Sequence, residues 1–195
     1  MIIDCDTSRF VWEVIDNNEY SYLFKNLVVM DVGCDWGSFS LWMNDLARKI
    51  YAIDISEENI KRLKTNIQTN QLTKIVPYHC AIGGKTKERY YDLDAKPGNG
   101  SSKITESGFK TIQMYTVNDF MKREGIDYVD VLKLDIEGCE YETLEAPDFP
   151  REKISTIVGE FHGEKSERQK KIEDILHLLG YRTTIDKRHF LGRRI

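Results

Sequence analysis

The sequence has few of the features that mark membrane, secreted or metal-binding chains. No apolar run approaches the roughly 20 residues that a membrane-spanning helix needs. The N-terminus, MIIDCDTSRF, has acidic residues where a signal peptide has a basic region. The four cysteines are scattered along the chain and form no C-x-x-C pair, which is typical of buried thiols in a reducing compartment. We therefore expect a cytoplasmic chain without a membrane segment, a disulfide framework or a structural zinc site.

Strong charge of one sign is also absent. The 195 residues contain 28 Lys and Arg against 32 Asp and Glu, for a net charge of −4. This balance argues against nucleic-acid binding driven by overall charge. A hydrophobic content of 41% excludes a disordered chain. The length predicts a single domain over 1–195, with a short N-terminal extension, 1–26, before the first strand.

Short apolar segments alternate with segments of helical periodicity. Strands are expected over 27–30, 50–55, 75–81, 129–135 and 154–161, with strand-like segments over 89–94 and 111–117 and a hairpin within 181–195. Helices are expected over 38–49, after the N-cap Ser56, from Gly138, and from a capping box of Ser166 and Gln169 to a stop at Gly180. The Gly- and Ser-containing stretch 83–119 interrupts this rhythm and is expected to be partly loop.

Strands separated by helices predict right-handed crossovers and a mostly parallel sheet, an α/β fold. Ligands of such sheets bind at the carboxyl ends of the strands. The residues that directly follow each strand are therefore the candidates for a functional site.

A turn with two glycines, DVGCDWGS, follows the first strand. Gly33 allows a sharp turn, and Gly37 allows close packing or close approach of a ligand. The middle glycine of the dinucleotide fingerprint G-x-G-x-x-G is missing, and Asp31 and Asp35 would repel a diphosphate. The loop suits a ligand with positive charge and no phosphate, such as S-adenosylmethionine. The alternative is a structural turn with solvated acids.

Residues after the next two strands also suit a nucleoside. Asp54 ends the second strand about 20 residues after Gly33, where a carboxylate can accept hydrogen bonds from two ribose hydroxyls. Ala81 and Ile82 follow the third strand, where small or apolar side chains can pack against the face of an adenine ring. The alternative for Asp54 is a solvated or capping acid, and the alternative for Ala81 and Ile82 is ordinary packing at a strand end.

The densest cluster of charge is VLKLDIEGCE, from Val131 to Glu140. Strand alternation places Lys133 and Asp135 on one face, with Glu137 just beyond the strand. Charged groups packed at one strand end are costly unless they pair or bind a ligand. A network of surface ion pairs is the alternative.

This run resembles the L-L-K-x-D-x-E-G-x-E hallmark of the FkbM family of S-adenosylmethionine-dependent methyltransferases. DVGCDWGSFS, YAIDISEENIKRLKTNI, CAIGG, NGSSK and YTVNDFM resemble further segments of that family in the same order. Val117 and Asn118 depart from the family's T-L-D-D-F-like segment, and Asp54 stands where Glu is more common. The resemblance implies a Rossmann-like class I methyltransferase fold. Its sheet is seven-stranded and mostly parallel, has helices on both faces, and has the strand order 3-2-1-4-5-7-6.

The resemblance also implies roles for site residues. Asp31, Gly33 and Gly37 would form the loop at the methionine end, and Asp54 would hold the ribose. Asp135 and Glu137, with Lys133, would face the transferred methyl group and the acceptor. The complete predicted cofactor site comprises Asp31, Gly33, Cys34, Asp35, Gly37, Asp54, Ile55, Ala81, Ile82 and Asp135.

A hydroxyl acceptor must lose its proton, and side chains at the same sheet edge are the candidate bases. These are Asp135, Glu137 and His162, which follows the fifth strand, with Glu160 placed to orient the histidine. Asp135, Glu137 and His162 could instead gather a divalent cation, but no feature of the sequence requires one and we predict no metal.

We therefore predict an S-adenosylmethionine-dependent methyltransferase acting on a hydroxyl of a small molecule, a sugar or secondary metabolite. One alternative is an RNA methyltransferase, which a basic tail supports; its residues are Arg182, Lys187, Arg188, His189, Arg193 and Arg194. No NPPY-type motif follows the fourth strand, and neither nucleic acid nor membrane is expected as a partner. A second alternative is a cofactor-binding domain that acts through a partner. A third, an NAD-dependent enzyme, is disfavoured by Asp35 and Trp36 in the loop. The sequence names neither the acceptor nor an oligomeric state.

Overall fold

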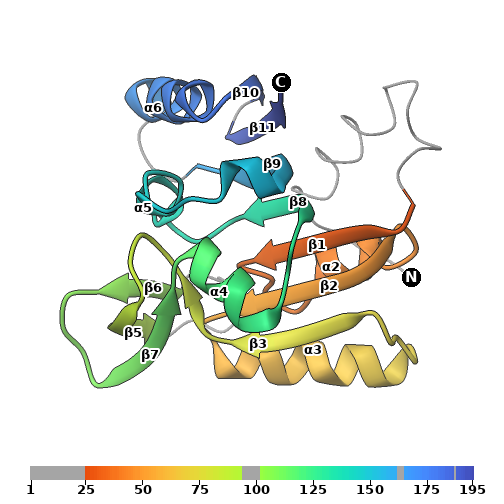
Figure 1. The fold of residues 1–195 in the computed structure, drawn as a ribbon. Coiled ribbons are helices and arrows are strands. Elements are labelled where there is room, and N and C mark those ends of the chain that lie inside the picture. The colour runs from red at the N-terminus through yellow and green to blue at the C-terminus, as the bar shows by residue number, and fades with distance from the viewer. Residues whose placement is uncertain (1–24, 94–101, 162–164, 187) are drawn as a thin grey trace.

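The computed structural model, which describes residues 25–93, 102–161, 165–186 and 188–195, contains a seven-stranded sheet between layers of helices (Figure 1). The strands are β1 (Leu27–Val32), β2 (Ala47–Asp54), β3 (Ile75–His79), β8 (Val129–Leu134), β9 (Ile154–Glu160), β10 (Tyr181–Asp186) and β11 (His189–Arg194). Their spatial order is β10-β11-β9-β8-β1-β2-β3. β11 pairs antiparallel with β9 and β10, and the other neighbours pair parallel. Counted along the chain, this is the order 3-2-1-4-5-7-6, which confirms the predicted fold class.

Two hydrophobic clusters lie on opposite faces of this sheet, because successive strand residues point to opposite sides. The fully buried Val29 belongs to one cluster and Met30 to the other. The helices are α2 (Ser38–Met43), α3 (Glu57–Thr69), α4 (Val117–Glu124), α5 (Glu140–Leu144) and α6 (Lys165–Leu178), with a 3-10 turn η1 (Arg151–Lys153). Residues of α2 and α3 pack with Val29, and residues of α4, α5 and α6 pack with Met30.

The helix predicted after Ser56 is confirmed. The Ser56 side chain accepts a hydrogen bond from the backbone N–H of Asn59 at 3.3 Å, which satisfies one of the donors left free at a helix N-terminus. Glu57 and Glu58 lie in the first turn of α3, where the helix dipole favours negative charge. The cap fixes where β2 ends and therefore where Asp54 lies.

The helix predicted over 38–49 is wrong in its second half. α2 ends at Met43, and β2 begins at Ala47, which pairs with Leu27 of β1. Leu46 still packs against the cluster that contains Phe39. The spacing of the apolar residues therefore correctly indicates which side chains are buried, but pairing with β1 decides that the backbone from Ala47 onward is a strand.

The described residues between 83 and 119 form most of a second, four-stranded sheet, which the sequence did not predict as a unit. Its strands are β4 (Ala81–Ile82), β5 (Lys87–Leu93), β6 (Ser102–Thr105) and β7 (Lys110–Tyr115), in the order β4-β7-β5-β6. The strand predicted over 75–81 breaks at Cys80, because Ala81 pairs with Met114 of β7 instead of continuing along β2. Val117, predicted as strand, begins α4, since the side chain of Thr116 caps that helix by accepting from Asp119 N–H at 3.1 Å.

The remaining helix starts and the C-terminal hairpin are close to expectation. α5 begins at Glu140, with Cys139 as its N-cap, because the left-handed φ of 104° at Gly138 places that residue outside the helix. α6 begins at Lys165, one residue before the predicted cap Ser166. The hairpin predicted within 181–195 is confirmed as β10 and β11. Within the described ranges, no helix is long and apolar enough to cross a membrane.

Candidate functional site

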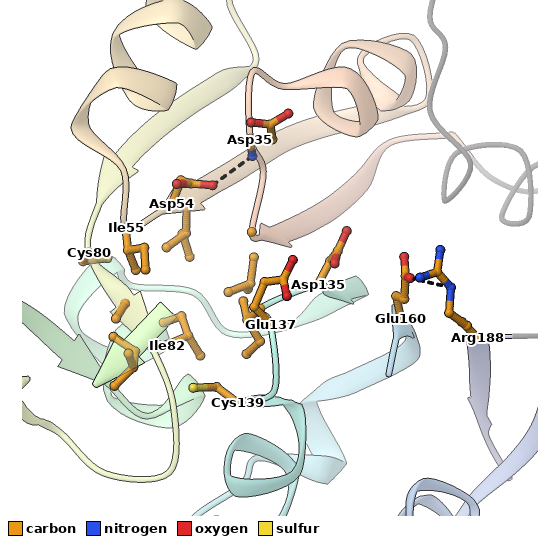
Figure 2. A pocket seen from close by; sticks show the side chains of 16 residues that line it. Asp35, Asp54, Ile55, Cys80, Ile82, Asp135, Glu137, Cys139, Glu160 and Arg188 are labelled. Atoms are coloured by element: carbon orange, nitrogen blue, oxygen red, sulfur yellow. Dashed lines mark hydrogen bonds and ion pairs between the residues drawn. The ribbon is translucent and has the colours of Figure 1, made fainter. Parts of the chain in front are cut away.

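A cavity of about 480 Å³ opens at the carboxyl ends of β1, β2, β8 and β9 (Figure 2). This is the edge at which the parallel topology predicts a ligand. Eight of the predicted site residues line it: Gly33, Asp35, Asp54, Ile55, Ala81, Ile82, Asp135 and Glu137. Four others do not; Asp31, Cys34 and Lys133 are buried, and Gly37 is the N-cap of α2. His162 lies outside the described residues.

The turn after β1 is shaped by a close approach of two backbones. Gly33 has a φ of +76°, and a Cβ atom there would lie 1.8 Å from the carbonyl oxygen of Asp135. Only glycine therefore fits. Gly37 has a φ of +95°, and its Cβ would lie 2.4 Å from Leu63 Cδ1. Of the two uses expected for Gly37, the structure shows close packing, against α3.

Asp54 forms the fixed end of the site. Its Oδ1 accepts from Ser56 N–H at 2.8 Å and from Asn59 Nδ2 at 3.2 Å, and its Oδ2 accepts from Asp35 N–H at 2.9 Å. Burial raises the pKa of Asp54 to about 6, although these bonds favour the ionised form. Each carboxylate oxygen has about two lone-pair sites, so Oδ2, which accepts one hydrogen bond from the described residues, can also accept a hydrogen bond from a hydroxyl of a ligand in the cavity.

Apolar side chains form the wall beside Asp54. Ile55 continues from β2, Ala81 and Ile82 form β4, and Ile104 reaches the cavity from β6. Ile104 was not predicted as a site residue, because nothing in the local sequence indicates that β6 folds over this edge. This wall can hold a flat, apolar ring next to the carboxylate.

A buried ion-pair network lies beneath the cavity. Lys133 Nζ donates to the carbonyl oxygen of Gly33 at 2.8 Å and lies 3.2 Å from Asp31 Oδ1 and 3.6 Å from Asp135 Oδ2. Burial disfavours the ammonium form, but Asp31 and Asp135 outweigh it and raise the pKa of Lys133. The Lys133 side chain is 4% exposed, so the lysine holds the two strand ends together and does not face the cavity.

The acidic loop after β8, which carries Asp135 and Glu137, is stabilised by hydrogen bonds to Glu140, for which the sequence predicted no role. The carboxylate of Glu140 accepts from the backbone N–H of Ile136 at 3.0 Å and of Gly138 at 2.9 Å. Between them, Glu137 has a left-handed φ of 52°, a conformation costly for a residue with a side chain. The fully buried Glu140 thus stabilises the backbone shape that turns Glu137 toward the cavity.

Glu160 and Arg188 form the end of the site far from Asp54, as Figure 2 shows. Arg188 Nε lies 3.0 Å from Glu160 Oε1, and His189 Nε2 lies 3.8 Å from Glu160 Oε2. Glu160 was expected to orient His162, and in the described residues it pairs with Arg188. Arg188 appeared in the sequence only as part of a basic tail; its place beside β9 follows from the antiparallel pairing of β11.

The cavity also contains thiols, which are poor candidates for chemistry. Cys80 and Cys139 line it, and burial raises the pKa of each to about 12. Both stay protonated at neutral pH. Within the part of the chain that the structure describes, no three His, Cys, Asp or Glu side chains form a metal-binding group.

Comparison with known proteins agrees with this geometry. Residues 24–183 match the family model described as Methyltransferase FkbM domain. A hexuronic acid methyltransferase, AglP, from Haloferax volcanii is 21% identical over 135 residues, covering 69% of this chain and 56% of that protein. The chain therefore spans little more than half the length of this relative.

Solved structures with the same fold include two methyltransferases. The FkbM methyltransferase of Methylobacillus flagellatus KT has a TM-score of 0.58 and 15% identity, over 98% of this chain and 56% of that chain. The magnesium protoporphyrin IX methyltransferase ChlM of Synechocystis PCC 6803, solved with bound SAM, has a TM-score of 0.56 and 14% identity, over 96% and 79%.

Proposed function

The chain belongs to the methyltransferase FkbM domain family, and we propose that it transfers the methyl group of S-adenosylmethionine to a hydroxyl of a small molecule, a sugar or sugar-like metabolite. The observation that carries the proposal is Asp54. It is a carboxylate only 8% exposed, it faces the cavity, and an apolar wall lies beside it. A ribose bound through its hydroxyls, with the adenine against the wall, matches both features.

The charges around the cavity fit this cofactor. Among the described residues, its lining holds one cation and five carboxylates, which are those of Asp35, Asp54, Asp135, Glu137 and Glu160. Such a lining attracts a sulfonium and an ammonium and repels a diphosphate. The cofactor expected from the sequence is therefore one that the residues present can hold, with Asp54 at the ribose, Asp35 toward the methionine end and Asp135 beside the transferred methyl group and the acceptor.

When bound, S-adenosylmethionine supplies a methyl carbon whose bond to sulfur breaks as the acceptor oxygen bonds to it, leaving a neutral thioether. The chain's contribution is to orient the acceptor, which can account for roughly 7–11 kcal/mol of the barrier, and to take its proton. Asp135 and Glu137 line the cavity and can accept that proton, a contribution of roughly 10²–10⁴-fold. Lys133 holds Asp135, and Glu140 holds the loop that carries Glu137.

A sugar acceptor is supported by the relative from Haloferax volcanii, a hexuronic acid methyltransferase. The RNA alternative is weakened by ion pairs within the basic tail. Arg188 pairs with Glu160 at 3.0 Å, and Arg194 pairs with Glu152 at 3.6 Å. The alternative of a non-catalytic domain is weakened by the two carboxylates at the acidic loop.

Calorimetry with S-adenosylhomocysteine and with NAD tests the cofactor. We expect micromolar-range binding of the first, none of the second, and a large loss of binding in Asp54→Ala. Asp45→Ala, which removes an exposed carboxylate outside the cavity, is the matched control and should bind as the wild type does. NAD binding of comparable strength would overturn the cofactor assignment.

Transfer of labelled methyl groups tests the chemistry. We expect Asp135→Asn to retain S-adenosylhomocysteine binding and to lose most of its turnover. An unchanged turnover rate would remove Asp135 from the mechanism.

A further inference from the structure

The cavity has two ends of different character. Asp54 ends β2 and Glu160 ends β9, and β1 and β8 lie between these strands. Three strand spacings of about 4.8 Å separate the two ends by roughly 14 Å. Figure 2 shows Asp54 at one side of the site and the pair of Glu160 and Arg188 at the other. The inference that follows rests on the proposed function, which places the ribose at Asp54.

The far end is the side from which an acceptor reaches the methyl group. In S-adenosylmethionine the sulfur is bonded directly to the ribose C5′, so a ribose at Asp54 puts the methyl group over the middle strands, β1 and β8. Beyond that point the cavity is lined by Glu137, Glu160 and Arg188. These three side chains are therefore placed to touch the acceptor.

Arg188 is fixed in position by its backbone. Its carbonyl oxygen accepts from Phe161 N–H at 2.9 Å, and the next residue begins β11. Its Nε lies 3.0 Å from Glu160 Oε1, and the Glu160 side chain is 12% exposed. This ion pair holds the guanidinium beside Glu160, and the group carries five N–H donors. Among the described residues that line the cavity, it is the only positively charged side chain.

From this arrangement we infer that the acceptor is a sugar acid, whose carboxylate is bound by Arg188 while its hydroxyls are bound by Asp135 and Glu137. The guanidinium fork matches a carboxylate in two parallel hydrogen bonds. Neighbouring carboxylates are suitable acceptors for sugar hydroxyls but would repel a second charge on the ligand. A single cation beside Glu160 and Glu137 therefore suits a singly charged carboxylate better than a phosphate.

The ion pair itself contributes little to folding, because the Arg188 side chain is 60% exposed. Substitution of Arg188 should therefore leave the fold and the Asp54 end intact. Arg182, an exposed residue of β10 in the same hairpin and outside the cavity lining, provides a control that removes the same charge without touching the site.

The test compares methyl transfer from labelled S-adenosylmethionine to three pairs of methyl glycosides: the glucuronide, galacturonide and mannuronide, each with its neutral parent sugar. Glucose 6-phosphate is the phosphate arm. For at least one pair we expect the wild type to prefer the acid by 10-fold or more in kcat/KM. The preference should fall to near 1 in Arg188→Gln, persist in part in Arg188→Lys and be unchanged in Arg182→Gln. S-adenosylhomocysteine should bind all four proteins equally.

Each other outcome counts against the inference. Equal or better transfer to neutral sugars or to the phosphate, or an acid preference that survives in Arg188→Gln, would overturn it while leaving methyl transfer to hydroxyls in place. Transfer to none of these compounds would also overturn it, and the binding of S-adenosylhomocysteine would then decide separately whether the cofactor assignment stands.

Discussion

Lys133 Nζ lies 3.2 Å from Asp31 Oδ1, and the two residues face each other in the register of β8 and β1 with neither exposed to solvent. The same ammonium reaches the carbonyl oxygen of Gly33 and lies 3.6 Å from Asp135 Oδ2. One buried cation thus links the turn at the cofactor end of the cavity to a carboxylate at the acceptor end.

Replacement of Lys133 by Met should destabilise the fold strongly. It leaves Asp31, which is fully buried, without its ion-pair partner, and breaking a buried pair in this way costs about 3–5 kcal/mol. Urea denaturation measures the loss. The double variant Lys133→Met with Asp31→Asn should recover much of it, since Ser40 Oγ can still donate to the remaining side-chain oxygen. A single variant no less stable than the double would show that leaving the Asp31 carboxylate unpaired costs nothing.

The affinity for the cofactor should depend on pH because the Asp54 carboxyl group must be ionised to bind the ribose. Burial raises its pKa from 3.8 to about 6, and ribose hydroxyls bind the ionised form. Affinity for S-adenosylhomocysteine should therefore fall as the pH drops below 6, by up to about tenfold per pH unit. Calorimetry between pH 4.5 and 7.5 measures this, and Asp54→Asn should flatten the profile.

The contribution of Asp54 to the free energy of unfolding should change with pH in the opposite direction to the cofactor affinity. A raised carboxyl pKa means that the folded chain holds this proton more tightly than the unfolded chain, so ionised Asp54 destabilises the fold above pH 6 by roughly 3 kcal/mol. That penalty is relieved as the pH falls from about 6 toward 4. The stability of Asp54→Asn relative to the wild type should therefore decrease over this range. A difference that does not vary with pH would contradict the raised pKa.

Gly33 and Gly125 provide a matched pair of glycine substitutions. Both have positive φ, 76° and 64°, but a Cβ at Gly33 would lie 1.8 Å from the Asp135 carbonyl oxygen, whereas a Cβ at Gly125 has no atom within 4 Å. Gly125→Ala should cost only the roughly 1–2 kcal/mol of a left-handed residue. Gly33→Ala should cost clearly more and abolish S-adenosylhomocysteine binding. Thermal unfolding and calorimetry measure both effects, and equal costs would show that the close approach is unimportant.

Glu140→Gln should weaken the acidic loop without touching a ligand. The amide nitrogen cannot accept the N–H bond that one carboxylate oxygen accepts now, so one of the two bonds to Ile136 and Gly138 is lost, a cost of about 1–3 kcal/mol. We expect lower kcat with little change in S-adenosylhomocysteine affinity. Glu145→Gln, which alters an exposed ion pair with Lys171, should stay within about 0.5 kcal/mol of the wild type. A Glu140 variant with unchanged kcat would exclude the positioning role.

Much of the fold was predictable because its signals are local. The apolar run of β1, the Ser56 cap of α3 and the order of strands and helices are read from neighbouring residues, and they lead to a parallel sheet with its ligand edge at the carboxyl ends. Most of the residues predicted at that edge after β1, β2 and β8 line the cavity, because a residue that directly follows a parallel strand lies at the carboxyl edge of the sheet. Asp31, Cys34, Gly37 and Lys133 do not.

The errors arose where a distant segment decided the local conformation. The segment after Met43 turns into β2 because Ala47 pairs with Leu27, and the chain breaks at Cys80 because Ala81 pairs with Met114. Neither pairing partner lies close in the sequence, so periodicity over a few residues could not reveal either change.

By itself the sequence determined most strands and helices of the main sheet, the edge at which the strands end and the acids that follow β1, β2 and β8, because these depend on residue order and strand alternation. The tertiary structure alone decided which charges are paired. It placed Lys133 under the cavity instead of in it, put Glu140 behind the acidic loop, and brought Arg188 to Glu160 through the antiparallel return of β11. Charge pairing depends on distances between strands that are remote in the chain, and those distances exist only once the sheet has formed.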